Sequence, residues 1–406
     1  MSMKIKKTKK SINNLILFIF LTICIFFPAD PYGVKLIAFA LLFVLNGKLI
    51  VRKIGDARYR PVLIFGSLFP ITIMLQSIML TGNVVKSISS AYSPVLLLLL
   101  IPIIEIKLSF KKYVLILLKT MSVCVLLIAI TDVIGVFNVN RASFIRDSFY
   151  KYGMGVMGKS AAYSSYYRIF FKASPLLVLL LDDSISKGDY KWLVASFGAL
   201  WFTGTRANVF SALIIIFFRY VIWSDSKKTT RYLIAVAILA LSLLNISRIY
   251  NMIVGQMNTT GAIASDFVRS GELLAYKEVF SDPIKLILGT GFGSPFYNYG
   301  RDSIGYTSEL SYFEMIRCVG LIFAIPFFLF VLKPVFSKKV KADYKLSYIC
   351  YLVIAATNPL LFSSTAMIMY MFLYEDIIKP NERQDSFESS IDKHIKKRIV
   401  LRLHKT

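Results

Sequence analysis

The chain has 406 residues, of which 56% are hydrophobic, and its formal net charge is +25. This composition excludes a soluble globular domain of the same length, because many side chains of such a domain must face water. The apolar residues come in runs of about 20, the length of a membrane-spanning helix, and a chain in lipid must satisfy its backbone polar groups internally. We therefore predict an all-α fold, a polytopic membrane helix bundle in which residues 1–406 form a single integral membrane domain.

Apolar runs follow one another along the chain and predict about twelve transmembrane helices. The first run follows five lysines and is not followed by a cleavage motif, so we interpret it as an uncleaved span rather than a signal peptide. The last run, 346–378, is too long for one span, and Asn358-Pro359 interrupts it, which predicts two short helices. The other predicted spans are 12–27, 34–51, 61–80, 91–104, 113–137, 168–181, 191–204, 207–223, 232–247 and 310–332.

The basic residues predict the orientation, because cytoplasmic loops are rich in Lys and Arg. With the N-terminus inside, every second loop falls inside, and these loops contain the basic clusters at 52–60, 107–112, 219–231 and 333–345. The basic tail, 379–406, also falls inside, so we predict that both termini are cytoplasmic. The membrane topology therefore accounts for the high net positive charge. This disfavours nucleic acid as a partner, and the lipid bilayer is the partner that we expect.

Cysteine and histidine form no metal-binding or catalytic pattern. The four cysteines lie inside apolar runs without CxxC spacing, and both histidines lie in the basic tail. We predict no metal site and no disulfide framework. A site in the membrane or on the outer face must therefore work without the commonest general base.

Two predicted outer loops, 138–167 and 248–309, are long enough to carry function. Both contain cations that the orientation rule disfavours outside, which indicates an anionic ligand. Phosphate or pyrophosphate suits arginine, whose guanidinium group pairs with it bidentately. The alternative is a solvated face or contact with anionic lipid headgroups. The arginines we single out are Arg141, Arg146, Arg168, Arg269 and Arg301.

Arg206 lies in the sequence Thr203-Gly204-Thr205-Arg206-Ala207-Asn208, a tight outer turn between two predicted spans. A charged residue at membrane depth costs about 2.5–3.5 kcal/mol on insertion scales, so such a residue is a candidate for function. The alternative is a side chain that reaches the outer interface by snorkelling.

The large outer loop contains a predicted helix over 266–280, which Ser265 or Asp266 caps. Its apolar side chains lie near one stripe, which is typical of a helix at the membrane interface. Arg269 and Glu272 are spaced to form an ion pair on its other side. The apolar stripe consists of Phe267, Leu273, Tyr276 and Phe280.

A polar segment then leads into the next span. In Gly289-x-Gly291-x-Gly293, Gly291 would let the backbone approach a ligand closely, and a plain turn is the alternative. Glu309 has no obvious local partner, and burial would raise its pKa, as suits a general base. Tyr312 follows as a substrate-binding candidate, and Glu314 and Arg317 are spaced to neutralise each other.

The order of these motifs along the chain is similar to that of a known protein family. TGTRAN joins two spans, and the large loop then reads Arg269-x3-Leu273-Leu274-Ala275-Tyr276, Asp282-Pro283 and the glycine motif, before a span with Gly320-Leu321-Ile322. This pattern resembles the Wzy-type polysaccharide repeat-unit polymerases and the related O-antigen ligases. Its specific part covers roughly residues 200–325.

The resemblance implies an enzyme that joins oligosaccharide units carried on undecaprenyl pyrophosphate, at the outer face of the bacterial cytoplasmic membrane. The product would be a surface polysaccharide such as O-antigen, capsule or exopolysaccharide. Arg206 and Arg269 would be catalytic by holding the pyrophosphate. Glu309 would activate the acceptor hydroxyl, at about the position where ligases carry a histidine. The substrate-binding set is Arg141, Arg146, Arg168, Gly291, Arg301 and Tyr312.

The reaction so implied needs no metal and no cofactor, because the donor is already activated on its lipid. A chain-length regulator and a flippase are partners to expect. Two other functions share these features. A flippase of lipid-linked oligosaccharide would need cations along a path through the bundle, and an O-antigen ligase would need the histidine that this chain lacks in its outer loops.

Overall fold

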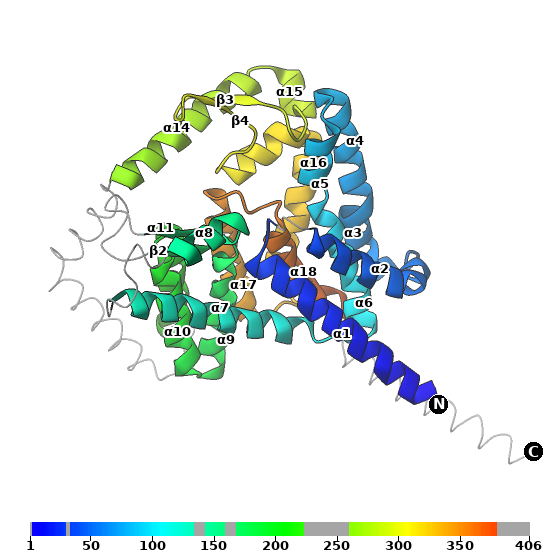
Figure 1. Ribbon diagram of the computed structural model, residues 1–406. Helices are drawn as coiled ribbons and strands as arrows, with labels where there is room; N and C mark the ends of the chain where they lie inside the picture. Colours follow the sequence, from blue (N-terminus) through cyan, green and yellow to red (C-terminus); the bar gives the residue numbers. More distant parts are fainter. Residues whose placement is uncertain (1, 30–32, 134–142, 159–167, 223–259, 380–406) are drawn as a thin grey trace, which may run out of the picture.

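A computed structural model describes residues 2–29, 33–133, 143–158, 168–222 and 260–379 (Figure 1). Arg141, the predicted span 232–247 and nearly all of the basic tail lie outside the described residues.

Six helical segments of the described chain are long and apolar enough to cross a membrane. The chain is therefore a mostly helical protein with the helices of a membrane protein, and six predicted spans coincide with these segments. The segments are α1 (Ser2–Phe26), α2 (Val34–Arg52), the run of η1 (Ala57–Tyr59), α3 (Arg60–Leu63), η2 (Ile64–Leu68) and α4 (Phe69–Thr81), the run of α5 (Val84–Ala91), η3 (Ser93–Leu99) and α6 (Leu100–Glu105), α7 (Phe110–Val133) and α16 (Ser311–Phe336).

Shorter helices complete the bundle. The predicted break at Asn358-Pro359 is confirmed, because one helix ends at Ala356 and the next begins at Ser364. These helices are α9 (Leu177–Lys187), α10 (Tyr190–Phe202), α11 (Arg206–Phe217) with its continuation η5 (Phe218–Ile222), α17 (Ala342–Ala356) and α18 (Ser364–Ile378).

The predicted helical span 168–181 is wrong in its first part. Residues 168–171 form strand β2 (Arg168–Phe171), which pairs antiparallel with β1 (Gly155–Gly158) after the short helix α8 (Ser143–Lys151). Alternate side chains of β2 are buried, as in a strand rather than a helix. Pro175 lacks a backbone N–H and lies in the 3₁₀ turn η4 (Ser174–Leu176), so the regular helix begins only at Leu177.

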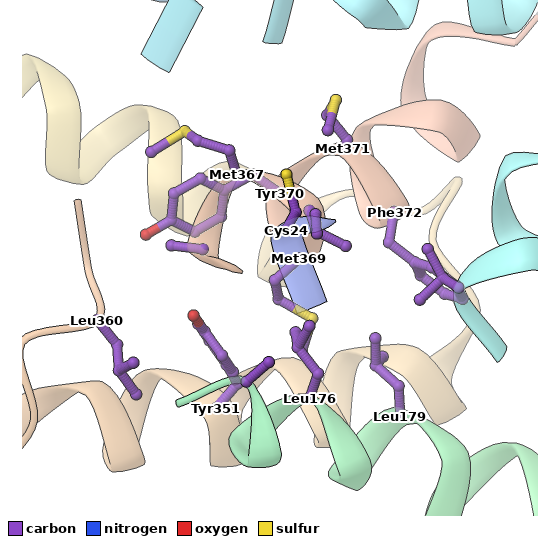
Figure 2. Packing of buried hydrophobic residues seen from close by; sticks show 14 of the residues in the cluster. Cys24, Leu176, Leu179, Tyr351, Leu360, Met367, Met369, Tyr370, Met371 and Phe372 are labelled. Carbon is purple, nitrogen blue, oxygen red and sulfur yellow. The ribbon is translucent and has the colours of Figure 1, made fainter. Parts of the chain in front are cut away.

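Helix α18 lies at the centre of the core. Every residue from Ser364 to Glu375 is buried, as expected for a helix that is apolar on all sides. Figure 2 shows Met367, Met369, Tyr370, Met371 and Phe372 of α18 among side chains of other helices. Those partners include Cys24, Leu176, Leu179 and Tyr351.

One end of the molecule is covered by α14 (Thr260–Phe280), α15 (Pro283–Leu288) and the hairpin of β3 (Phe296–Asn298) and β4 (Ser303–Gly305) (Figure 1). We call these elements the cap layer. The predicted helix 266–280 is confirmed in its extent toward Phe280, but the helix begins at Thr260. Ser265 and Asp266 therefore lie inside it and do not cap it.

The cap layer is fitted to a break in α16. Gly320 has φ 71° and ψ 168° inside this helix, so the carbonyl groups before it are free to accept other donors. Thr290 N–H donates to Arg317 O at 2.7 Å, and Gly291 N–H donates to Cys318 O at 2.8 Å. A Cβ on Gly289 would lie 2.5 Å from Gly320 N, so the two backbones meet where only glycine fits.

We expect Gly320→Ala to destabilise the protein by more than about 1 kcal/mol, because alanine disfavours positive φ. Its Cβ would also overlap the carbonyl oxygen of Ile287. Thermal unfolding in detergent measures the effect. The control is Gly47→Ala in α2, where a Cβ meets nothing within 4 Å. Equal melting temperatures for the two variants would contradict the role of the break.

Candidate functional site

Three arginines from distant parts of the chain meet at the cap layer through two carboxylates. Asp266 Oδ1 accepts from Arg206 Nη2 at 3.0 Å and from Arg269 Nη1 at 3.3 Å. Glu309 pairs with Arg269 Nη2 at 3.2 Å through Oε2 and with Arg301 Nη2 at 3.0 Å through Oε1. We call these five residues the arginine–carboxylate cluster.

Different elements position the members of the cluster. Arg206 is the first residue of α11 and follows Gly204, whose φ of 64° makes the tight turn. Asp266 and Arg269 lie one turn apart on α14. Arg301 follows β3, and Glu309 lies just before α16. The cluster therefore exists only when the bundle, the cap layer and α16 are assembled.

The cluster has charge and access suited to an anion. Three arginines against two carboxylates leave a net charge of +3 − 2 = +1. Arg206 and Arg269 keep 29% and 24% of their side-chain surface exposed, and Arg301 keeps 52%. Because ion pairs with this much exposure contribute only about 0–1 kcal/mol, an incoming anion can displace the carboxylates. Arg269 Nε is buried without a hydrogen-bond partner among the described residues.

The structure brings Arg206, Arg269 and Glu309 together, and Arg301 joins them. Glu309 was expected to have no local partner, and its two arginines indeed come from elsewhere in the large loop. The predicted pair of Arg269 with Glu272 is also wrong, because Arg269 turns to Asp266 and Glu309.

Arg168 lies at the same turn as Arg206. Its Nε donates to Thr203 O at 3.2 Å, and a Cβ on Gly204 would lie 2.9 Å from its Cγ. Arg146 instead pairs with its neighbour Asp147 at 3.2 Å on α8. None of its described ion pairs reaches the cluster.

Gly291 and Tyr312 make their contacts within the protein. A Cβ on Gly291 would lie 3.1 Å from Ser77 Cα, so the close approach of its backbone serves packing on α4. The Tyr312 hydroxyl donates to Leu352 O of α17 at 3.1 Å. In this structure Gly291 therefore serves packing, and Tyr312 makes an internal hydrogen bond.

The predicted pair of Glu314 and Arg317 is confirmed and proves to be buried. Arg317, which is 1% exposed, donates to Glu314 with Nε and Nη2, both at 2.8 Å. Its Nη1 donates to Ser294 Oγ at 2.6 Å, and Tyr276 donates to Glu314 Oε2 at 3.0 Å. This network attaches both α14 and the loop after α15 to α16.

A second buried network was not predicted. Glu272, which is fully buried, accepts from Ser308 Oγ at 2.7 Å, from Asn298 Nδ2 at 3.2 Å and from Glu309 N–H at 3.2 Å. Burial raises the pKa of its carboxyl group above the ordinary value. The i, i+3 spacing had suggested a partner on the same helix, whereas the real partners come from β3 and from the segment before α16.

A cavity of about 300 Å³ is lined by neighbours of Glu309 in the sequence, although none of the five cluster residues is part of its wall. Its wall includes Ser308 and Ser311, on either side of Glu309, and Pro359, close to the Thr357 carbonyl that accepts from Arg269 at 3.4 Å. Tyr92 and Tyr306 contribute rings. Apolar atoms form most of its wall, Lys35, Lys172 and Glu314 add charge, and other lining residues carry hydroxyl groups that can both donate and accept hydrogen bonds. They belong to Ser89, Ser90, Ser93, Thr307, Ser308, Ser311, Ser363 and Ser364.

Among the described residues, no group of three or more His, Cys, Asp or Glu side chains is placed to hold a metal ion. The chain matches no model of a known protein family. No curated protein sequence matches it significantly. Its function is therefore inferred from its own residues and their geometry.

We expect Arg317→Met to lower the free energy of unfolding by about 3–5 kcal/mol, because it leaves Glu314 buried without its cation. Thermal unfolding in detergent again reports the change. Arg146→Met is the matched control, since an exposed pair contributes about 0–1 kcal/mol. A stable Arg317→Met protein would show that this network does not hold the cap layer to α16.

Proposed function

We propose that the protein is a membrane glycosyltransferase of the Wzy polymerase type, which joins lipid-linked oligosaccharide units into a surface polysaccharide. The observation that carries the proposal is the arginine–carboxylate cluster, in which Arg206, Arg269 and Arg301 converge, with a cavity whose wall includes Ser308 next to Glu309. A diphosphate on a lipid carrier is an anion that several arginines can bind at once. The cavity supplies room for a sugar next to it.

The proposed topology has twelve crossings, with both termini in the cytoplasm and the cap layer outside. Ion pairs and hydrogen bonds support it, because they join segments that the topology puts on one side. On the inner side, Arg219 pairs with Asp182 and Asp343, each at 2.7 Å. On the outer side, Arg206 of the TGTRAN turn pairs with Asp266 of the large loop.

Helices α9, α10, α17 and α18 have 11 to 15 residues and are short for a span of about 20. Irregular backbone at membrane depth is tolerated where protein covers it. The 3₁₀ turn η4 before α9 is buried, and Leu360 and Leu361 before α18 are buried as well. These segments therefore extend the short helices toward the length of the bilayer.

In the proposed reaction, the donor's diphosphate lies against Arg206, Arg269 and Arg301. A glycosidic bond forms between the acceptor oxygen and the donor's anomeric carbon, and the bond from that carbon to the phosphate oxygen breaks. The electron pair leaves with the undecaprenyl pyrophosphate, whose growing charge the arginines stabilise. Donors already aimed at developing charge are usually the largest catalytic contribution.

Glu309 accepts the proton of the acceptor hydroxyl. Its oxygens are occupied by Arg269 and Arg301 in this structure. A diphosphate that draws these two arginines to itself releases the carboxylate at the moment when a base is needed. The cavity holds the acceptor sugar near it.

The distribution of charge favours this reaction over transport. A flippase needs polar groups along a path through the bundle. The central helix α18 is apolar from Ala366 to Leu373 apart from one tyrosine, and its charged residues come only at Glu375 and Asp376. The cations of the candidate site gather at the cap layer.

We expect membranes that contain the protein to extend the lipid-linked repeat units of its host into a ladder on a gel. Arg206→Ala and Arg269→Ala should each reduce the rate by about 10²–10³-fold, because each removes a donor to the leaving group. Glu309→Gln should reduce it by about 10²–10⁴-fold, because it removes the base. Arg58→Ala, whose side chain pairs with Asp56 outside the cluster, should retain the activity.

Movement of the repeat units across sealed vesicles without a ladder would instead identify a flippase. Transfer of finished chains to a lipid A core, with no polymerisation, would identify a ligase. Either result contradicts the polymerase.

The topology is tested by thiol labelling of two variants, Lys285→Cys in the cap layer and Lys338→Cys between α16 and α17. Both positions are exposed. We expect a membrane-impermeant maleimide to label the first variant in intact cells and the second only after permeabilisation. The wild-type protein is the control for its own cysteines, of which Cys24, Cys318 and Cys350 are buried. The reverse pattern would invert the protein in the membrane.

A further inference from the structure

Glu272 is a carboxylate in an unusual setting. It is fully buried on α14, and the described residues place no cation within ion-pair distance of it. Its charge is instead met by neutral donors, namely the Ser308 hydroxyl, the Asn298 amide and the backbone N–H of Glu309. A buried carboxylate held in this way costs free energy, so its position calls for an explanation.

The groups that donate to Glu272 lie in the two segments that carry Glu309 and Arg301. Glu309 N–H is within 3.3 Å of Glu272 Oε1 and 3.2 Å of Oε2, so Glu272 holds the backbone of the proposed base. Ser308, the residue before it, donates at 2.7 Å and in turn accepts from Leu310 N–H at 3.0 Å. This arrangement orders the whole segment in front of α16.

The segment that carries Arg301 is connected to Glu272 through Asn298. Its Nδ2 donates to Glu272, and its Oδ1 accepts from Gly300 N–H at 2.9 Å and from Arg301 N–H at 3.1 Å. The turn that presents Arg301 is thereby tied to the same carboxylate.

Arg269 completes the geometry. It lies one turn before Glu272 on α14 and contacts the side chain of Glu309, while Glu272 contacts its backbone. Two residues of α14 therefore hold Glu309: Arg269 pairs with its side chain, and Glu272 accepts from its backbone N–H.

We propose that Glu272 is a positioning residue for the transfer reaction, which sets the place of Glu309 without touching the substrate. The inference rests on the proposed function. A carboxylate suits the task because both its oxygens only accept, and three donors converge on them. An amide in its place would turn an NH₂ group toward one of these donors.

Burial raises the pKa of the Glu272 carboxyl group, and the hydrogen bonds from Ser308 and from the Glu309 N–H oppose this rise because they favour the charged form. A residue that served packing alone would be better replaced by an apolar or amide side chain. Retaining a carboxylate here is explained by the donors that it orients.

The test uses the full-length protein in membranes with its lipid-linked repeat units, and it compares Glu272→Gln with Glu278→Gln. Glu278 lies on the same helix, is exposed and accepts from the Tyr299 hydroxyl. We expect Glu272→Gln to lower kcat by about 10- to 100-fold with KM for the repeat unit nearly unchanged, since misplaced groups lose rate rather than binding. Glu278→Gln should behave like the wild type.

A double variant separates positioning from structure. If Glu272 acts through Glu309, then Glu272→Gln causes little further loss of kcat in a protein that already carries Glu309→Gln, because residues that act as a unit are not additive. Multiplied losses, a rise of KM that accounts for the effect, or an unaffected Glu272→Gln enzyme would each overturn the inference.

Two further outcomes, a Glu272→Gln protein that is absent from the membrane and a wild-type protein without activity, are each decided by a separate measurement. If Glu272→Gln does not reach the membrane, Ser308→Ala removes one donor to the same carboxylate and should lower kcat several-fold, again with KM unchanged; unchanged kcat would overturn the inference. A wild-type protein that forms no ladder would refute the proposed function, and the positioning role would fall with it. A working wild type with an unaffected variant would refute the positioning role alone.

Discussion

The contact of two backbones, at Gly289 and Gly320, is the constraint on which the rest of the candidate site depends. Side chains at these positions would force the loop after α15 away from α16. The break at Gly320 also frees the carbonyls of Arg317 and Cys318, and the loop satisfies both. With that loop fixed, Arg317 reaches Ser294 and Glu314, and α14 is held above the start of α16.

Charge in this molecule is organised by the low-dielectric core between its two ends. The centre is the apolar helix α18, and the ion pairs of the described residues lie toward the ends of the helices or in the cap layer. Several partners meet each of the buried charges of Arg317 and Glu272. The partly exposed cluster differs, because its arginines are held by carboxylates that an anion can replace.

The sequence predicted what depends on neighbouring residues. Long apolar runs predicted about twelve spans, six of which coincide with long apolar helices of the described chain. The Asn358-Pro359 break predicted two helices, and the spacing of Glu314 and Arg317 predicted their pair. Contacts between residues of distant segments were not predicted. Glu309 meets arginines that local spacing does not reveal, and Glu272 faces β3 rather than Arg269. At Arg168, strand pairing with β1 and the position of Pro175 outweighed hydropathy.

One face of α14 links these features. Arg269, Glu272 and Tyr276 follow at intervals of three and four residues, so they lie on the same side of the helix. Arg269 contacts the Glu309 carboxylate, Glu272 its backbone, and Tyr276 the Glu314–Arg317 pair. A shift of α14 as a unit would therefore move Arg269, the proposed phosphate-binding residue, and Glu309, the proposed base, together. Arg206, on α11, belongs to the bundle and reaches this face through Asp266 alone among the ion pairs described. In the proposed reaction, a diphosphate that replaces Asp266 would join the bundle to the cap layer through the substrate itself, so the proposed catalytic arrangement would be complete only when the donor is bound.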